Sequence, residues 1–340
     1  MNGNRQKNDN LYTISSDNIQ VDEQDKRCAP GKTFENGSCI RLEILIQCAQ
    51  SFNEEFPDDA IELDSKRENL HPGKYKKYLV KEFNERLGEK CTTQKCWTRQ
   101  NFIRRIPQIA QEELEKYTWR PQTGKDEGTE WLNTDDIDSA MEQYEMKYPN
   151  FKFLGSLPRD FQDHDMFRKD ETLYKQLWKD GKTKIGVVYN TDAVGSAGEH
   201  WNALYADFEK GEVYFFDSYG VAPNKEVQNH MKQLERFIRN NCNEMTRVNR
   251  NKNNLMKSQR SSADGKVVEP PNEQSAKCNI IKIGHNKEKH QKKGSECGVY
   301  SMNFILRMLR GDTFEQICKS KVDDDTMNKC RKVYFTKEEE

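Results

Sequence analysis

The sequence predicts an α+β protein, in which helical patterns precede and follow a group of strands. Short runs rich in aromatic and branched apolar residues, bounded by glycine, proline and asparagine, are typical of strands. They occur at 151–154, 184–190, 198–206, 213–219 and 278–283. Apolar residues three and four positions apart are typical of amphipathic helices. They occur at 42–49, 75–87, 98–117, 135–148 and 299–309. The pattern therefore predicts a sheet with helices before and after it.

Composition limits the classes to which the protein can belong. Of its 340 residues, 34% are hydrophobic and 33% are charged, and the formal net charge is -1. The overall charge therefore points to no particular partner. No apolar run is long enough to cross a bilayer, and the first residues lack the apolar core of a signal peptide. We therefore expect a soluble, intracellular protein with no membrane partner, whose cysteines are reduced thiols.

The chain divides into four regions by pattern. Residues 1–25 are polar and are expected to form a disordered tail, and 26–120 a helical accessory domain. Residues 121–335 are expected to form a second domain, interrupted by a basic, mobile insert at about 246–275. Between 231 and 293 there are 15 Lys and Arg against 6 Asp and Glu. Such a segment is either a solvated loop or a binding site for nucleic acid phosphates.

Five cysteines in the amino-terminal half could bind zinc. They are Cys28, Cys39, Cys48, Cys91 and Cys96. None shows the two-residue spacing of a structural zinc site, and no histidine is suitably interleaved. We therefore expect neither a metal nor an organic cofactor.

Cys297 is predicted to begin a helix. Gly294, Ser295 and Gly298 surround it, the helical pattern follows from Val299, and Gly311 ends the run. A thiol in the first turn of a helix ionises more easily to the nucleophilic thiolate. The alternative is an inert, buried cysteine.

A base and an acid precede this cysteine in the chain. His200 lies in one strand and Asp217 at the end of the next, and Gly211 between them favours a hairpin turn. His200 lies about nine or ten residues before the turn and Asp217 about six after it. Contact between them would therefore need a bulge or a bent strand, to close an offset near 10 Å at roughly 3.3 Å per residue.

These residues suggest nucleophilic catalysis. His200 would take the proton of Cys297, and Asp217 would fix the tautomer of the imidazole. Gln291 would donate a hydrogen bond to the oxyanion, beside the N–H of Cys297. His285 and His290 are alternative bases, but they lie in a lysine-rich loop without an evident orienting acid.

Three motifs follow one another in the chain: His200-Trp201, Asp217-Ser218, and Gln291 six residues before Cys297-Gly298. Their order resembles that of the SUMO-specific proteases and the adenovirus protease. Trp-Leu-Asn-Thr-Asp-Asp-Ile at 131–137 is similar to the opening of this family's catalytic domain, although Thr134 departs from it. The resemblance covers about 131–320. It implies a papain-like cysteine peptidase core, a central mixed sheet flanked by helices, in the domain at 121–335. It also implies that Trp131 and Trp201 cover a narrow tunnel, so that cleavage follows Gly-Gly or a similar small-residue pair.

Within this superfamily, the motif from Cys28 to Cys39 is similar to amino-terminal regions of proteins from giant amoeba viruses. The resemblance implies a maturation protease of a large DNA virus, which cleaves capsid or core precursors in the virion and in the viral factory of the host cytoplasm. Two alternatives remain. One is a protease that removes a ubiquitin-like modifier, and the other is a non-catalytic module that binds nucleic acid or a scaffold. The oligomeric state is not predicted.

Overall fold

The computed structural model describes residues 27–63, 71–123, 130–163, 167, 171–196, 198–241 and 281–336. The chain forms two compact units, Met1–Lys147 with Asp325–Glu340, and Tyr148–Asp324. The predicted tail at 1–25 and the predicted insert at 246–275 lie outside the described residues. The predicted domain boundaries stay predictions.

The second unit is built on a five-stranded mixed sheet in the order β1-β2-β3-β4-β5. The strands are β1 (Phe151–Leu157), β2 (Lys184–Asn190), β3 (Trp201–Asp207), β4 (Glu212–Phe216) and β5 (Lys282–His285). The β1–β2 and β4–β5 pairs are parallel, and the two central pairs are antiparallel. The predicted mixed sheet and its central hairpin are confirmed, and Gly211 has the positive φ (66°) expected at the hairpin turn.

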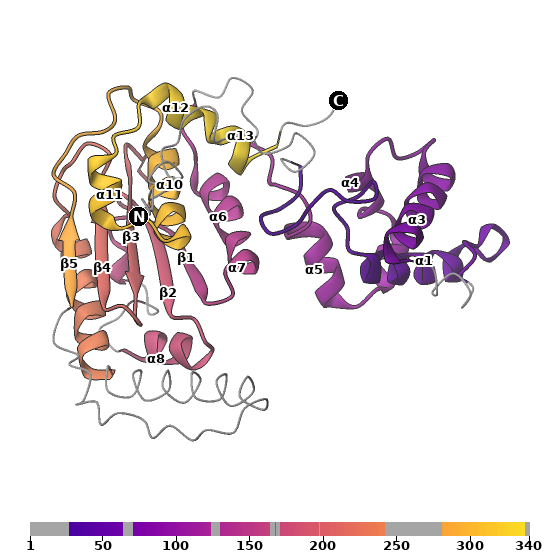
Figure 1. Ribbon diagram of the computed structural model, residues 1–340, viewed down its shortest axis with the longest axis horizontal. Coiled ribbons are helices and arrows are strands. Elements are labelled where there is room, and N and C mark those ends of the chain that lie inside the picture. The colour runs from indigo at the N-terminus through magenta and orange to yellow at the C-terminus, as the bar shows by residue number, and fades with distance from the viewer. Residues whose placement is uncertain are drawn as a thin grey trace, which may run out of the picture. The chain divides into compact units, whose positions relative to one another are not determined.

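Helices cover both faces of this sheet (Figure 1). Alternate strand residues such as Ile185, Val187 and Tyr189 share one core with apolar residues of α8 (Thr172–Lys179) and of the helix at 225–241. On the other face lie α10 (Cys297–Arg310) and α11 (Phe314–Lys319), and α10 packs on β2 and β3. The close approach of α10 requires a glycine in β2, because a Cβ on Gly186 would lie 2.9 Å from Ile305 Cγ2.

The helix α10 begins and ends where the sequence predicts. All its residues except Arg310 are buried, so it is the central helix of this unit. Gly311 ends it with φ 105°, and the Gly311 N–H donates to the carbonyl oxygens of Arg307 and Met308. A left-handed glycine is a common helix stop because it has no Cβ to clash.

The first unit is helical (Figure 1), which confirms the predicted amino-terminal helical region. Its elements include α1 (Leu42–Glu55), η2 (Pro57–Asp59), α3 (Pro72–Leu87), α4 (Gln94–Trp97), η3 (Asn101–Arg105), α5 (Gln108–Lys116), α6 (Thr134–Glu142), α7 (Tyr144–Lys147) and α13 (Arg331–Tyr334). The helix α12 (Asp324–Lys329) starts at the last residue of the second unit. The short helix η4 (Phe161–Asp163) also belongs to the second unit. Phe52, Phe83 and Phe102 pack ring against ring in the core of the first unit.

The single helix predicted at 98–117 is wrong. The structure has η3, then Ile106 in an extended conformation, and then α5. Pro107 separates them, because proline disfavours the helical conformation of the residue before it and has no N–H to donate. The apolar spacing continues across this break, so the spacing alone did not reveal it.

The expectation of reduced thiols is wrong for two pairs of cysteines. Disulfides join Cys28 to Cys39 and Cys91 to Cys96, with Cα atoms 5.4 Å and 5.3 Å apart. Tight turns between Cys28 and Cys39, with positive φ at Gly31 and Gly37, bring the first pair together. The expectation was wrong because it rested on the length of the chain and on its start, which say nothing about such local turns. Four of the five cysteines considered as zinc ligands are thus paired with each other.

No helix among the residues that the structure describes is long and apolar enough to cross a membrane.

Candidate active site

Cys297 is the first residue of α10 and is 1% exposed. The residue before it, Glu296, makes no capping hydrogen bond with its side chain. The first N–H groups of a helix lack acceptors within the helix and carry a partial positive charge. The sulfur therefore lies where a thiolate, or an oxyanion formed beside it, is stabilised electrostatically.

His200 and Asp217 meet at one end of the β3–β4 hairpin. His200 comes directly before β3, and Asp217 comes directly after β4. The Nε2 atom of His200 is 3.1 Å from Oδ2 of Asp217. The imidazole also stacks on the ring of Tyr219, with 4.7 Å between the ring centroids. The carboxylate and the aromatic ring together restrict rotation of the imidazole.

This contact forms without a bulge, so the expected distortion of the hairpin is wrong. Pairing is continuous from Asp207 opposite Glu212 to Ala203 opposite Phe216. In that register the position opposite Asp217 is 202, which is two residues from His200. The offset is thus two residues rather than the three or four counted from the sequence, and it falls in the irregular segments beyond both strands.

The pKa of His200 is raised from 6.5 to about 9. Burial alone would lower it, because the imidazolium loses hydration, but hydrogen bonds and charge interactions with Asp217 and Cys297 raise it by more. Since Nε2 faces Asp217, Nδ1 is the ring nitrogen that is not bonded to the acid. At neutral pH the site therefore favours an imidazolium next to the sulfur.

Asn286 holds the backbone of Asp217, a role that no sequence pattern indicated. Its Oδ1 accepts a hydrogen bond from the Asp217 N–H at 2.8 Å, and its Nδ2 donates to the Asp217 carbonyl oxygen at 2.6 Å. Asn286 is buried. The other oxygen of the Asp217 carboxylate, Oδ1, accepts from the Tyr219 N–H at 2.6 Å. The carboxylate is therefore fixed from both its backbone and its second oxygen.

Gln291 is fully buried, and its amide is fixed in orientation. Its Oε1 accepts from the Ser218 hydroxyl at 2.6 Å, and its Nε2 donates to the Lys293 carbonyl oxygen at 2.7 Å. The Gln291 N–H donates to the Ser218 carbonyl oxygen. An amide nitrogen carries two hydrogens, so Nε2 keeps a second one after its bond to Lys293. Ser218, which directly follows Asp217, thus joins the acid to the glutamine.

Asp324 supports the loop between Gln291 and Cys297. Its buried carboxylate accepts from the N–H groups of Lys292 and Lys293, at 2.9 Å and 2.8 Å, and from the Tyr300 hydroxyl at 3.0 Å. Sequence reasoning assigned no function to the acidic run at 323–325. Its charge pattern resembles an ordinary helix start, and nothing in the pattern shows that one of the three carboxylates is buried.

The other candidate residues differ in their surroundings. Trp201 is buried at the start of β3, next to His200, whereas Trp131 is 44% exposed and belongs to the first unit. His285 ends β5 opposite Phe215. His290 is buried against Phe216, and burial is the main cause that lowers its pKa. No group of three or more His, Cys, Asp or Glu side chains able to hold a metal occurs among the described residues.

The family match covers the region that holds these residues. A model of the Ulp1 protease family, C-terminal catalytic domain, matches residues 131–339. The chain belongs to this family. This Ulp1-family chain is also 31% identical over 318 residues to a putative thiol protease, R355, of Acanthamoeba polyphaga mimivirus, with 91% of this chain and 92% of the relative covered. The predicted cysteine peptidase class and the predicted superfamily are confirmed.

Solved structures support the fold of this Ulp1-family chain. The crystal structure of the ASFV pS273R protease is similar with a TM-score of 0.53 at 18% identity, covering 92% of this chain and 96% of that one. The C-terminal Ulp1 protease domain in complex with SMT3, the yeast orthologue of SUMO, is more distant, with a TM-score of 0.35 at 16% identity over 60% of this chain and 74% of that one. The first likeness agrees with the predicted α+β fold.

Proposed function

We propose that this Ulp1-family cysteine peptidase is an endopeptidase with Cys297 as the nucleophile, His200 as the base and acid, and Asp217 as the residue that orients the imidazole. The observation that carries the proposal is the hydrogen bond between Asp217 and His200, whose pKa is raised by both Asp217 and Cys297, with Cys297 at the start of α10. An acid, a base and a nucleophile in contact are the signature of nucleophilic catalysis.

In the proposed mechanism the Cys297 sulfur attacks the carbonyl carbon of the scissile peptide bond. The oxyanion accepts hydrogen bonds from the Cys297 N–H and from the second hydrogen of Gln291 Nε2. His200 gives its proton to the leaving amine as the C–N bond breaks, and a thioester remains on Cys297. Water, deprotonated by His200, then hydrolyses the thioester and regenerates the thiolate.

The proposed cleavage site follows Gly-Gly or a similar pair of small residues. It is supported by the motif resemblance, in which Trp131 and Trp201 cover the substrate tunnel, and by the buried position of Trp201 next to His200. A lid of indole rings would exclude side chains by contact with their Cβ atoms. We propose these two tryptophans as substrate-binding residues.

The proposed substrates are capsid or core precursors of a large DNA virus, cleaved in the virion or in the viral factory. The support is the relative from Acanthamoeba polyphaga mimivirus, which matches over nine tenths of both chains. The basic insert at 246–275 is proposed to bind nucleic acid phosphates. Deletion of 246–275 tests this role, because unchanged DNA binding would exclude the insert from it.

Two substrates and one variant test the proposed function. Wild type and Cys297→Ala are compared on an extended peptide that contains Gly-Gly-Ala and on a folded ubiquitin-like protein with a carboxy-terminal extension. We expect cleavage of the peptide by the wild type alone. Preference for the folded protein would identify a deconjugating protease instead. A purified chain that cleaves neither, and whose Cys297 alkylates no faster than free cysteine, would support the non-catalytic binding module.

A further inference from the structure

Arg120, in the first unit, is a buried cation without an acceptor. It is 7% exposed, and its Nε and Nη1 atoms are buried with no hydrogen-bond partner among the described residues. Buried charges in proteins are almost always paired, because an isolated guanidinium loses its hydration without compensation. An orphaned buried group of this kind calls for a partner that the described residues do not supply.

Gln143 presents the complementary group. Its Nε2 donates to the carbonyl oxygens of Lys116 and Trp119, at 2.8 Å and 2.7 Å, which fixes the orientation of the amide. Its Oε1 then faces away from them and is buried with no donor in the part of the chain that the structure describes. Arg120 and Gln143 line the same cavity, of about 330 Å³. The cavity thus offers unused donors and an unused acceptor to one ligand.

The charges around this cavity limit the chemistry of that ligand. Besides Arg120, its lining includes two lysines and four carboxylates: Lys95, Lys116, Glu115, Asp135, Asp138 and Glu142. Four carboxylates would repel a phosphate dianion. A ligand that carries one carboxylate together with N–H or ammonium groups satisfies both the guanidinium and the acidic rim. A peptide segment has this mixture of groups.

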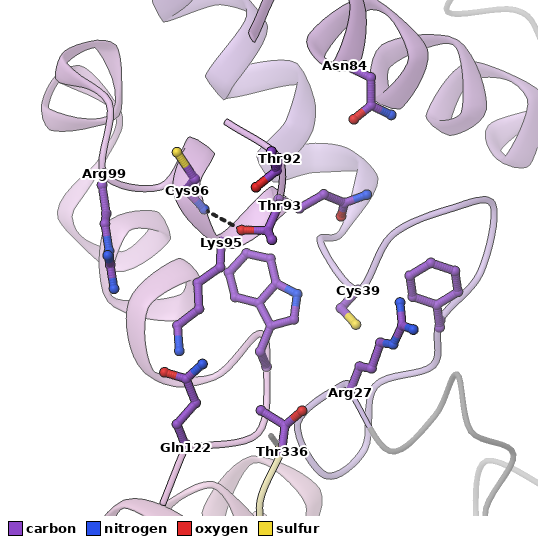
Figure 2. A pocket seen from close by; sticks show the side chains of 13 residues that line it. Arg27, Cys39, Asn84, Thr92, Thr93, Lys95, Cys96, Arg99, Gln122 and Thr336 are labelled. Atoms are coloured by element: carbon purple, nitrogen blue, oxygen red, sulfur yellow. Dashed lines mark hydrogen bonds between the residues drawn. The ribbon is translucent and has the colours of Figure 1, made fainter. Parts of the chain in front are cut away.

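The cavity also adjoins a second one, which gives an extended chain room to continue. Lys95 and Trp119 line both cavities, and the second has a volume of about 350 Å³. Its lining residues include Arg27 and Arg99 but no aspartate or glutamate. Figure 2 shows Arg99, Lys95 and Gln122 on one side of this second cavity and Arg27 on the other. A bound segment would thus pass from a mixed-charge cavity into a basic one.

We propose that the first unit holds a peptide-binding site anchored by Arg120. The Arg120 guanidinium donates to a carboxylate of the peptide, and Gln143 Oε1 accepts an N–H of the peptide. Basic side chains of the peptide face Asp135 and Glu142. The carboxylate belongs either to an aspartate or glutamate side chain or to a peptide carboxyl terminus.

Three peptide probes and the full chain test the proposal. The first probe is acetyl-Lys-Ala-Glu-Ala-Lys-amide, which has only a side-chain carboxylate. The second is Lys-Ala-Ala-Lys-Ala with a free carboxyl terminus, and the third replaces the glutamate of the first by glutamine. Binding is measured by isothermal calorimetry with the wild type, with Arg120→Met and with Arg104→Met, whose arginine is exposed and does not line the cavity. We expect the wild type and Arg104→Met to bind one of the two carboxylate probes at least ten-fold more tightly than the glutamine probe, and Arg120→Met to lose this preference.

Thermal unfolding provides a second readout that needs no ligand. Because Arg120 Nε and Nη1 make no hydrogen bond to the residues that the structure describes, Arg120→Met should leave the Tm unchanged or raise it. A Tm several degrees lower in Arg120→Met would show that the arginine is structural and would overturn the proposal. So would equal binding of the carboxylate and glutamine probes by the wild type, absence of binding by either carboxylate probe, or binding that survives Arg120→Met.

Discussion

Replacement of Asp217 by asparagine should shift the pH dependence of Cys297 reactivity. The rise in the His200 pKa from 6.5 to about 9 corresponds to about 3 kcal/mol in favour of the imidazolium. Asp217 and Cys297 each contribute a hydrogen bond and a charge interaction, and together these exceed the net rise because burial opposes them; at least half of the net, roughly 1.5 kcal/mol, therefore belongs to Asp217. Asp217→Asn should reduce the ratio of imidazolium to imidazole at least about ten-fold at a given pH, and move the alkaline limb about one pH unit or more toward neutrality.

The assay is the rate of Cys297 alkylation by iodoacetamide between pH 5 and 10, with peptide turnover measured in parallel. Asp180→Asn is the matched control, because Asp180 is exposed and lies at the end of α8. Because the pKa of folded His200 is raised, its stabilisation of the fold is complete below pH 6.5 and is lost as the pH rises through about 9. An alkaline limb that stays near pH 9 in Asp217→Asn, with turnover within two-fold of the wild type, would refute the assigned contact.

Three further predictions concern other parts of the chain. His230 is buried between two tyrosine hydroxyls, and burial lowers its pKa to about 3, so the wild type should lose stability as the pH falls from 6.5 toward 3. Urea unfolding at a series of pH values should show this loss in the wild type and not in His230→Phe. At pH 7 the free energy of unfolding of His230→Phe should be about 2 to 4 kcal/mol lower than that of the wild type. Removal of the disulfide between Cys28 and Cys39 by a double serine substitution should cost about 2 to 3 kcal/mol, measured by thermal unfolding against Cys318→Ser, whose cysteine is free. Asp324→Asn should lower kcat/KM roughly ten-fold, because the loop before Cys297 loses one hydrogen-bond acceptor. The far-ultraviolet circular dichroism should stay unchanged. A fall in kcat/KM of less than two-fold would contradict this.

The sequence predicted the elements that have a strong period or a clear stop signal. Short runs rich in aromatic and branched apolar residues defined the strands, and Gly311 ended α10 because a left-handed residue there favours glycine. The placement of His200 and Asp217 at one end of a hairpin also followed from the strand pattern. The exact offset did not, since the length of the turn decides the register and several turn lengths fit the segment from 207 to 212.

Other features had no local signal that could be interpreted. The break before α5 was hidden because the apolar spacing resumes after Pro107. Asn286, Ser218 and Asp324 are ordinary polar residues in turns and at a helix start, and only their burial distinguishes them from solvated ones. Burial depends on contacts between segments distant in sequence, which a residue pattern does not encode.

These buried polar residues form two short supports that meet at the acid. Asn286 holds the Asp217 backbone, and Ser218, the next residue, bonds to Gln291 in the loop that Asp324 fixes before α10. The acid, the glutamine and the start of the nucleophile helix are therefore connected by hydrogen bonds rather than positioned separately. Residues linked in one such network act jointly, so the effects of substitutions within it do not add. The site accordingly depends on the loop at 286–296 as much as on the strands. Residues of that loop make the hydrogen bonds that connect the acid, the glutamine and the start of α10.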